Sequence, residues 1–141
     1  MRRPAAAFVA LLLAVTTPLM AQNPGAPIHS SLFGAWVGGI IPPPVTLSAQ
    51  ECLAQPMVIF TRDSVMRALM NSTAYAQRAI DTVRATATGF EIRLDPPTVP
   101  GQPGFGCANQ DILPVQRRGD NEIVFVGCSA FPYPLIRCAT H

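Results

Sequence analysis

Short runs in which apolar and polar residues alternate recur along most of this chain, and they are typical of half-buried β-strands. The clearest run is Phe90–Leu94, where three apolar side chains face one way and two charged ones face the other. Hairpin-sized turns separate the runs, as at 118–121 around Gly119. The pattern therefore predicts an all-β domain, a small antiparallel barrel or sandwich of about seven or eight strands. The expected strands are 32–41, 57–60, 65–70, 80–88, 90–94, 112–117, 122–126 and 135–138.

Residues 63–84 allow a second interpretation. Apolar and small residues recur there at steps of three and four, with Asp63 in a position to cap a helix. A polar break at 71–73 and the β-branched stretch after Ile80 favour two strands with a turn near Asn71. We expect the strands, with an α+β fold carrying one helix near 63–84 as the alternative.

The first residues have the layout of a secretory signal peptide. Arg2 and Arg3 precede the apolar run 5–15, and Ala21 provides a small residue for cleavage. The expected organisation is a signal peptide at 1–21, a flexible leader at 22–31 and a single disulfide-braced β domain at 32–141. The mature protein is then expected in the periplasm or secreted, where cysteines oxidise.

Charge argues against two classes of partner. The chain has ten basic residues, all arginine, and eight acidic ones. Removal of Arg2 and Arg3 with the signal leaves a formal charge of zero, so no basic surplus remains for nucleic acid or an anionic membrane. The expected partner is another exported protein, and the oligomeric state stays open.

Four cysteines lie in the mature part, and an even number in a small exported chain indicates two disulfides. Zinc is disfavoured because no Cys-x-x-Cys pair occurs and the two histidines lie near the chain ends. Three pairings are possible. We favour one bond that closes nearly the whole domain and one that staples a hairpin, namely Cys52–Cys138 and Cys107–Cys128.

Gly34 and Trp36 form a Gly-x-Trp arrangement in the first predicted strand. This arrangement resembles that of small exported bacterial lipocalin-like β-barrel proteins, some of which are periplasmic protease inhibitors. The resemblance covers about ten residues. It implies a barrel in which Trp36 closes one end.

Three places are candidates for binding. The loop 95–106 is long and rich in proline and glycine, and it carries Pro100 and Phe105. The strand 122–126 is apolar on both faces, which indicates either a strand covered on both sides or one whose outer face, with Val124 and Val126, meets a partner. Trp36 and other large apolar residues could instead line a barrel interior that holds a small ligand.

The sequence offers little for catalysis. The only histidines are His29, in the expected leader, and His141, the last residue. No nucleophile elbow, phosphate-binding loop or haem motif accompanies them. We therefore expect no enzyme activity, no cofactor and no metal site. The expected function is that of an exported protein-binding module that uses exposed loops or a hairpin face, with a carrier of small hydrophobic ligands as the alternative.

Overall fold

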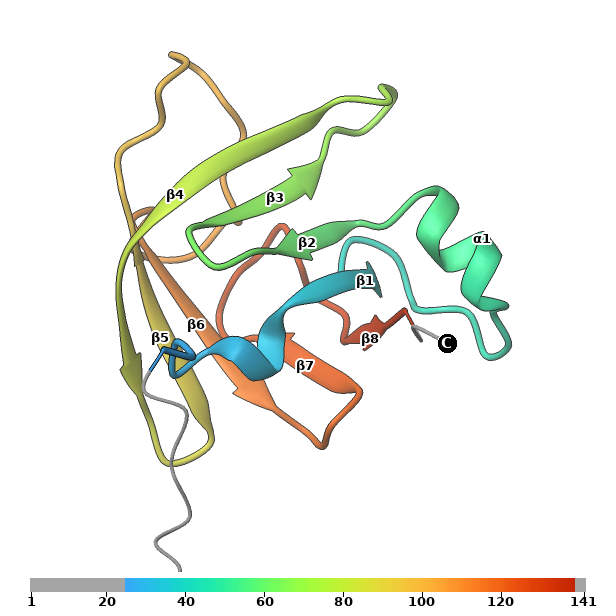
Figure 1. Cartoon of the computed structure of the whole chain (residues 1–141). Helices are drawn as coiled ribbons and strands as arrows, with labels where there is room; N and C mark the ends of the chain where they lie inside the picture. The colour runs from blue at the N-terminus through green and yellow to red at the C-terminus, as the bar shows by residue number, and fades with distance from the viewer. Residues whose placement is uncertain (1–24, 139–141) are drawn as a thin grey trace, which may run out of the picture.

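The chain folds into a closed, eight-stranded antiparallel barrel with one short α-helix (Figure 1). The computed structural model describes residues 25–138. Each strand pairs with its neighbours in the sequence, and the last strand pairs with the first to close the barrel. The all-β prediction is therefore confirmed, as a barrel and not a sandwich. Its elements are a 3-10 helix at Ser30–Leu32, β1 Gly34–Gly38, α1 Ala49–Ala54, β2 Val58–Phe60, β3 Ser64–Ala68, β4 Tyr75–Ala85, β5 Gly89–Leu94, β6 Ile112–Arg117, β7 Glu122–Phe125 and β8 Leu135–Arg137.

The inward faces of the strands supply the core. In β5, Phe90, Ile92 and Leu94 are buried, as their alternation predicts. In β7, Ile123 and Phe125 are buried in the same way. Aromatic side chains fill much of the interior, and the largest fully buried ones are Trp36, Phe60, Phe125 and Phe131.

The helical alternative for residues 63–84 is wrong. This stretch forms the β3–β4 hairpin, whose register pairs Ala68 with Tyr75. Asn71 lies in the connecting turn with φ 63°, a left-handed conformation that asparagine tolerates better than most residues. Burial alternates at the start of β4, where Ala76 and Arg78 are buried between more exposed neighbours. Side chains in this stretch therefore alternate between buried and exposed every two residues, as in a strand, and the spacing of three to four residues does not produce a helix.

The helix α1 has no counterpart among the predicted elements, which leave residues 42–51 as a linker. It begins with a capping box: Ser48 Oγ accepts the Glu51 N–H at 3.2 Å, and the Glu51 carboxylate accepts the Ser48 N–H at 3.0 Å. Only Cys52 of the helix is buried. This one turn and a half is therefore held by its cap and by the disulfide of Cys52.

The expected leader at 22–31 is only partly within the described residues, and its described end packs against the barrel. His29 is buried, and its Nε2 lies 3.1 Å from the carbonyl oxygen of Arg62. The 3-10 helix Ser30–Leu32 follows, and Leu32 is part of the core. Residues 29–31 are thus part of the folded domain, and the expected signal peptide lies outside the described residues.

Both favoured disulfides are present, Cys52–Cys138 and Cys107–Cys128. The first ties α1 to the residue that follows β8. The second joins the segment before β6 to the segment after β7, and so staples the base of the β6–β7 hairpin. Two disulfides fit an oxidising, extracytoplasmic setting. Within residues 25–138, no helix is long and apolar enough to cross a membrane.

Antiparallel topology sends alternate connections to opposite ends of the barrel. The turn end carries the short connections 61–63, 86–88 and 118–121 together with the segment before β1. The loop end carries four longer connections: 39–57, 69–74, 95–111 and 126–134. In Figure 1 the β4–β5 and β6–β7 turns lie at the bottom, while the β3–β4 hairpin and the β5–β6 loop reach the top.

Candidate functional site at the loop end of the barrel

Exposed apolar side chains concentrate at the loop end. Among residues 25–138, nine large hydrophobic residues are exposed, and Ile28 alone of these lies at the turn end. Val45 is the most exposed, with its full surface in solvent (101%). Single exposed apolar residues are ordinary, but their concentration at one end makes the loop end the candidate interaction surface. The eight at the loop end are Ile41, Val45, Leu47, Leu53, Met70, Val99, Val126 and Tyr133.

Phe105 and Phe131 plug the barrel at this end. Each comes from a loop-end connection and is almost fully buried, 3% and 1% exposed. Their ring centroids lie 5.4 Å apart, and both rings pack on Phe125 from inside the barrel, at 5.5 and 5.2 Å. Such aromatic clusters combine a large buried area with favourable edge and tilted contacts. The mouth of the barrel is therefore filled by the protein's own side chains.

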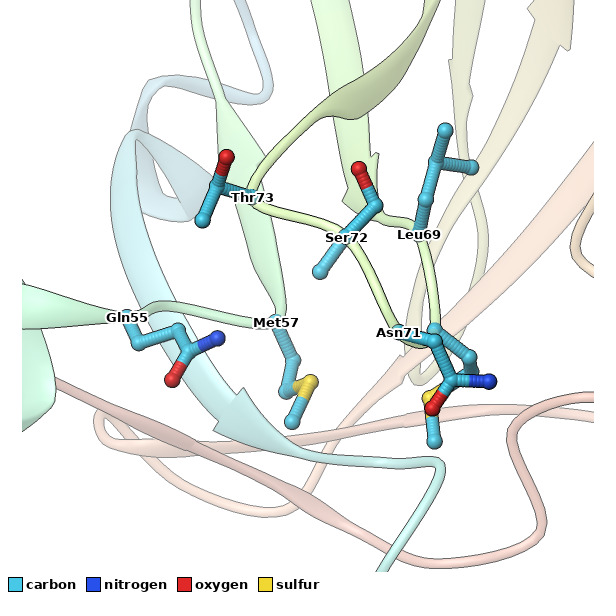
Figure 2. Close-up of a pocket in the computed structure, with 8 residues that line it drawn as sticks. Gln55, Met57, Leu69, Asn71, Ser72 and Thr73 are labelled. Atoms are coloured by element: carbon cyan, nitrogen blue, oxygen red, sulfur yellow. The ribbon is translucent and has the colours of Figure 1, made fainter.

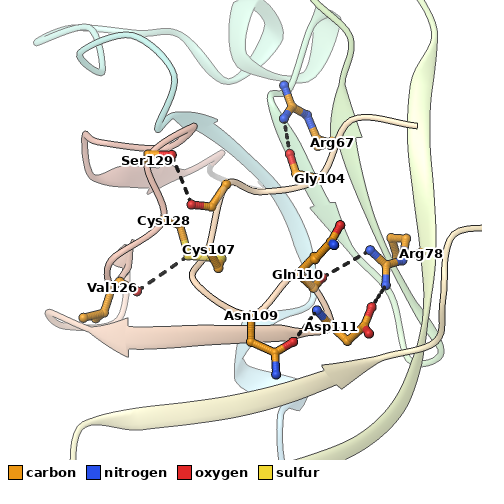
Figure 3. Close-up of a disulfide and its surroundings, with 11 residues drawn as sticks. Arg67, Arg78, Gly104, Cys107, Asn109, Gln110, Asp111, Val126, Cys128 and Ser129 are labelled. Carbon is orange, nitrogen blue, oxygen red and sulfur yellow. Dashed lines mark hydrogen bonds and ion pairs between the residues drawn. A yellow bond between two sulfur atoms is a disulfide. The ribbon is translucent and has the colours of Figure 1, made fainter. Parts of the chain in front are cut away.

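The two loops that supply the plug are tied together (Figure 3). The Cys107–Cys128 disulfide links them covalently. The N–H of Ser129 and its hydroxyl both donate to the carbonyl oxygen of Gly106, at 2.9 and 3.1 Å. Gly106 adopts φ +73°, and a Cβ there would lie 2.5 Å from the Ala130 nitrogen. Glycine is thus required where the loops cross.

Arg78 anchors the rest of the β5–β6 loop. Its side chain is 4% exposed and donates to the carbonyl oxygens of Asp95 and Gln110, at 2.7 and 3.3 Å. It also forms an ion pair with Asp111 at 2.8 Å (Figure 3). Asp95 and Asp111 bracket the loop, so one buried guanidinium holds both of its ends.

Arg67 anchors the same loop from β3. Its guanidinium donates to the carbonyl oxygen of Gly104 and lies 5.1 Å from the Phe131 ring centroid. Burial lowers the pKa of Arg67, because the charged form loses hydration. Arg67 therefore joins the β3 wall to the aromatic plug, by a hydrogen bond to one loop and a cation–π contact with the other.

Among the pockets at or beside the loop end, three are the largest. The first, about 470 Å³, lies between the β3–β4 turn and the approach to β2, with Met57 and Asn71 on opposite sides (Figure 2). The second, about 430 Å³, lies between the start of β4 and residues 98–103. The third, about 480 Å³, lies along β7 and residues 126–132.

The structure places some of the predicted binding residues in surface pockets and buries others. Pro100 lines the second pocket, and Val124 and Val126 line the third. Pro100 and Val126 lie in loop-end connections, Val124 lies in β7 next to them, and Val126 is 49% exposed. The predicted exposure of the loop is wrong at Phe105, whose side chain is 3% exposed and whose ring enters the core. Trp36 lies inside the barrel, and its indole N–H donates to the Leu32 carbonyl oxygen at 2.9 Å.

Sequence reasoning missed several parts of this surface. The exposed residues Val45 and Leu47 fall in residues 42–51, interpreted as a linker, although the pattern Ser48-x-x-Glu51 signals a helix start there. Met70 was expected at the end of a strand but is exposed beside the β3–β4 turn. The burial of Arg67 and Arg78 has no signal in the sequence, since charged residues rarely lie inside a domain.

The described residues do not bring together a catalytic constellation. His29 Nε2 faces the Arg62 carbonyl oxygen, and its Nδ1 is buried without a hydrogen-bond partner. No serine or carboxylate in residues 25–138 hydrogen-bonds the His29 ring, and His141 lies outside them. Nor do these residues contain a group of three or more His, Cys, Asp or Glu side chains placed to hold a metal ion.

Comparison with known proteins gives no match: no family model, curated protein or solved structure is similar to this chain at a significant level.

Proposed function

We propose that this chain is an exported, non-catalytic binding protein that engages another exported protein through the loop end of its barrel. The observation that carries the proposal is the distribution of exposed large apolar residues, eight of which lie at the loop end and one at the turn end of residues 25–138. A surface of this kind gains free energy when a partner removes it from water. The three pockets between its loops would receive side chains of that partner.

The packed mouth supports protein binding over carriage of a small ligand. Phe105 and Phe131 occupy the position through which a ligand would enter the barrel, and a disulfide holds the loops that carry them. A partner that docks on the outside of these loops needs no such opening. The β5–β6 loop is also held at both ends by Arg78, which lowers the entropy lost on binding.

The finer identity that we propose is a lipocalin-like barrel, with inhibition of an exported protease as one form of its function. Support comes from the closed eight-stranded barrel and from Gly34-x-Trp36 at its first strand, with Trp36 buried. This part rests on analogy of fold. Cleavage after Ala21 and residence in the periplasm or outside the cell belong to the same proposal. The mass of the mature chain, beginning at Gln22, tests them.

Site-specific photo-crosslinking tests the proposal. A benzophenone side chain is placed at Val45, Val99 or Val126, and at the exposed turn-end residue Ala87 as a control. Each full chain is exported by its own source cells and irradiated there. We expect an adduct of one partner mass from the loop-end positions and none from Ala87. Equal adducts from Ala87, or no adduct from any position, would contradict the proposal.

The inhibitor form has a separate test. The purified mature chain is titrated into the exported endopeptidases of the source cells, and hydrolysis of a casein substrate is measured. Inhibition that saturates at one chain per protease, and that Val45→Asp weakens, supports it. A crosslinked partner that is not a protease would leave protein binding in place and refute this form.

A further inference from the structure

The first half of β4 has a neighbour on one edge only. β4 spans Tyr75–Ala85, but its ladder with β5 begins at Ile80. Residues 75–79 pair with β3 alone. The barrel wall therefore opens between the start of β4 and the loop that follows β5, and Figure 1 shows the β3–β4 hairpin diverging there from the β5–β6 loop.

The hydrogen-bond alternation of the hairpin shows which backbone groups face this opening. The Leu69 N–H donates to the Ala74 carbonyl, and the Ile80 N–H donates to the Asp63 carbonyl. In an antiparallel pair, every second residue points its N–H and C=O toward the partner strand, and the residues between point away. The backbone groups that point away from β3, into the opening, are those of Tyr75, Gln77 and Ala79.

Two donors from the following loop already reach this edge. The Asp95 N–H donates to the Ala79 carbonyl oxygen at 3.0 Å. The side-chain amide of Gln102 donates to the Gln77 carbonyl oxygen at 2.9 Å. A carboxamide is the same chemical group as a peptide unit, so Gln102 stands where the N–H of an added strand would lie. Within residues 25–138, the loop makes no hydrogen bond to the Gln77 N–H or to either backbone group of Tyr75, so these stay available to a further strand.

The loop borders the edge without covering it. The pocket of about 430 Å³ lies between Tyr75–Gln77 and residues 98–103. Its walls include the apolar side chains of Leu69, Val99 and Pro100. Because proline has no N–H, the proline-rich loop is a poor partner for the β4 ladder. An unpaired edge beside an apolar groove is the arrangement that strand addition uses.

We propose that the β4 edge from Tyr75 to Ala79 accepts an extended peptide segment of the protein partner as an added β-strand. Main-chain hydrogen bonds to Tyr75 and Gln77 would supply affinity, and alternate side chains of the peptide would enter the groove beside Val99 and Pro100. The bound peptide displaces the Gln102 amide from the Gln77 carbonyl oxygen. This inference rests on the proposed function and names the chemistry of the segment that the partner presents.

Hydrogen exchange gives the most direct test. The mature chain, residues 22–141, is used to select peptides from a phage-displayed library of random twelve-residue sequences. Amide exchange is then measured by NMR with and without the tightest peptide. We expect the amides of Tyr75 and Gln77 to gain protection, because they enter a new ladder. The amides of Ala76 and Arg78, which already bond to β3, should exchange as before.

Variants of two residues test the same edge by affinity, measured as fluorescence anisotropy of the labelled peptide. Gln77→Pro removes the N–H that faces the peptide and no bond to β3, so we expect binding to weaken by about ten-fold or more. The matched variant Gln77→Thr keeps the N–H and should bind as the parent does. Gln102→Ala frees the Gln77 carbonyl oxygen and should tighten binding. Should Gln77→Pro fail to fold, judged by Trp36 fluorescence, the exchange pattern decides.

Three outcomes would overturn the inference: selected peptides that leave Tyr75 and Gln77 unprotected, no selected peptide at all, and a peptide site occupied instead by a second copy of the chain. The last is recognised by concentration-dependent protection of the edge without peptide. A failure here is distinct from a failure of the proposed function. If Val45 and Val126 crosslink to a partner while the amides of Tyr75 and Gln77 gain no protection, the binding of a protein partner is supported and strand addition at the β4 edge is refuted.

Discussion

The guanidinium of Arg137 lies over the indole of Trp36, 4.3 Å from the ring centroid. These residues face each other in the β8–β1 ladder that closes the barrel. Arg137 also donates to the backbone carbonyl oxygens of Ser31 and Phe33, the latter at 2.7 Å. Its pKa is lowered mainly by burial and then by the nearby charge of Arg117, while Asp120 acts in the opposite direction. One side chain therefore connects the last strand, the first strand and the 3-10 helix.

Arg137→Ala is expected to lower the free energy of unfolding by about 2–3 kcal/mol, from the lost cation–π contact and charge-assisted hydrogen bonds. Urea denaturation followed by Trp36 fluorescence measures it. Arg84→Ala is the control: Arg84 pairs with Glu91 at 2.9 Å but is 72% exposed, so we expect a change below about 0.5 kcal/mol. Equal effects of the two substitutions would show that the contacts of Arg137 do not stabilise the closure of the barrel between β8 and β1.

The two disulfides are expected to differ in both contribution and accessibility. Cys52–Cys138 spans 86 residues and Cys107–Cys128 spans 21, so the chain-entropy model gives about 4.6 and about 3.3 kcal/mol. Replacing each pair by alanine and measuring urea denaturation tests this order. A reversed order would mean that native contacts outweigh loop entropy.

Dithiothreitol should reduce Cys107–Cys128 first. Thiol–disulfide exchange needs access to sulfur, and Cys107 is partly exposed whereas both cysteines of the other pair are buried. Alkylation with iodoacetamide and peptide mass mapping at successive times would identify the order. Earlier labelling of Cys52 and Cys138 would contradict this expectation.

The strands could be predicted because their signal is local. Alternation in Phe90–Leu94 and 112–117 corresponds to a barrel wall with one face in the core, and the structure has strands at both places. The hairpin around Asn71 was also predicted, since turn chemistry and β-branched residues act over a few positions. The favoured disulfide pairing is confirmed, although three pairings fit the sequence equally.

The features that fill and cover the loop end depend on distant contacts. Phe105 lies in a loop full of prolines and glycines, and only its contacts with Phe125 and Phe131 explain why it is buried. The free edge of β4 arises because β5 begins to pair at Ile80, a register that single-strand periodicity does not contain. Each of these features depends on a contact between residues that are far apart in the sequence.

Phe105→Ala tests whether the loop end is plugged by its own side chains. Removal of a buried phenylalanine leaves a cavity, so we expect the free energy of unfolding to fall by about 3–5 kcal/mol in urea denaturation. Val99→Ala is the control in the same loop, because Val99 is 60% exposed and should change it by less than about 0.5 kcal/mol. A small effect of Phe105→Ala would contradict the plug, because a buried ring cannot be removed without a large loss of stability.

The helix α1 is expected to lose its cap on acidification. The pKa of Glu51 lies below its ordinary value of 4.5, first because Ser48 Oγ donates to its carboxylate at 2.7 Å and then because the Ser48 N–H does so at 3.0 Å. A carboxyl group whose folded-state pKa is lowered stabilises the fold above its unfolded pKa. That contribution is lost as the pH falls through the folded-state value.

The side-chain carboxyl 13C shift of Glu51, followed by NMR from pH 7 to 2, reports the titration directly. Ser48→Ala should raise the pKa of Glu51 toward 4.5, whereas Ser72→Ala, which alters a serine in the β3–β4 turn, should leave it unchanged. An unshifted Glu51 in the parent chain would mean that the capping box does not hold the start of α1 in solution.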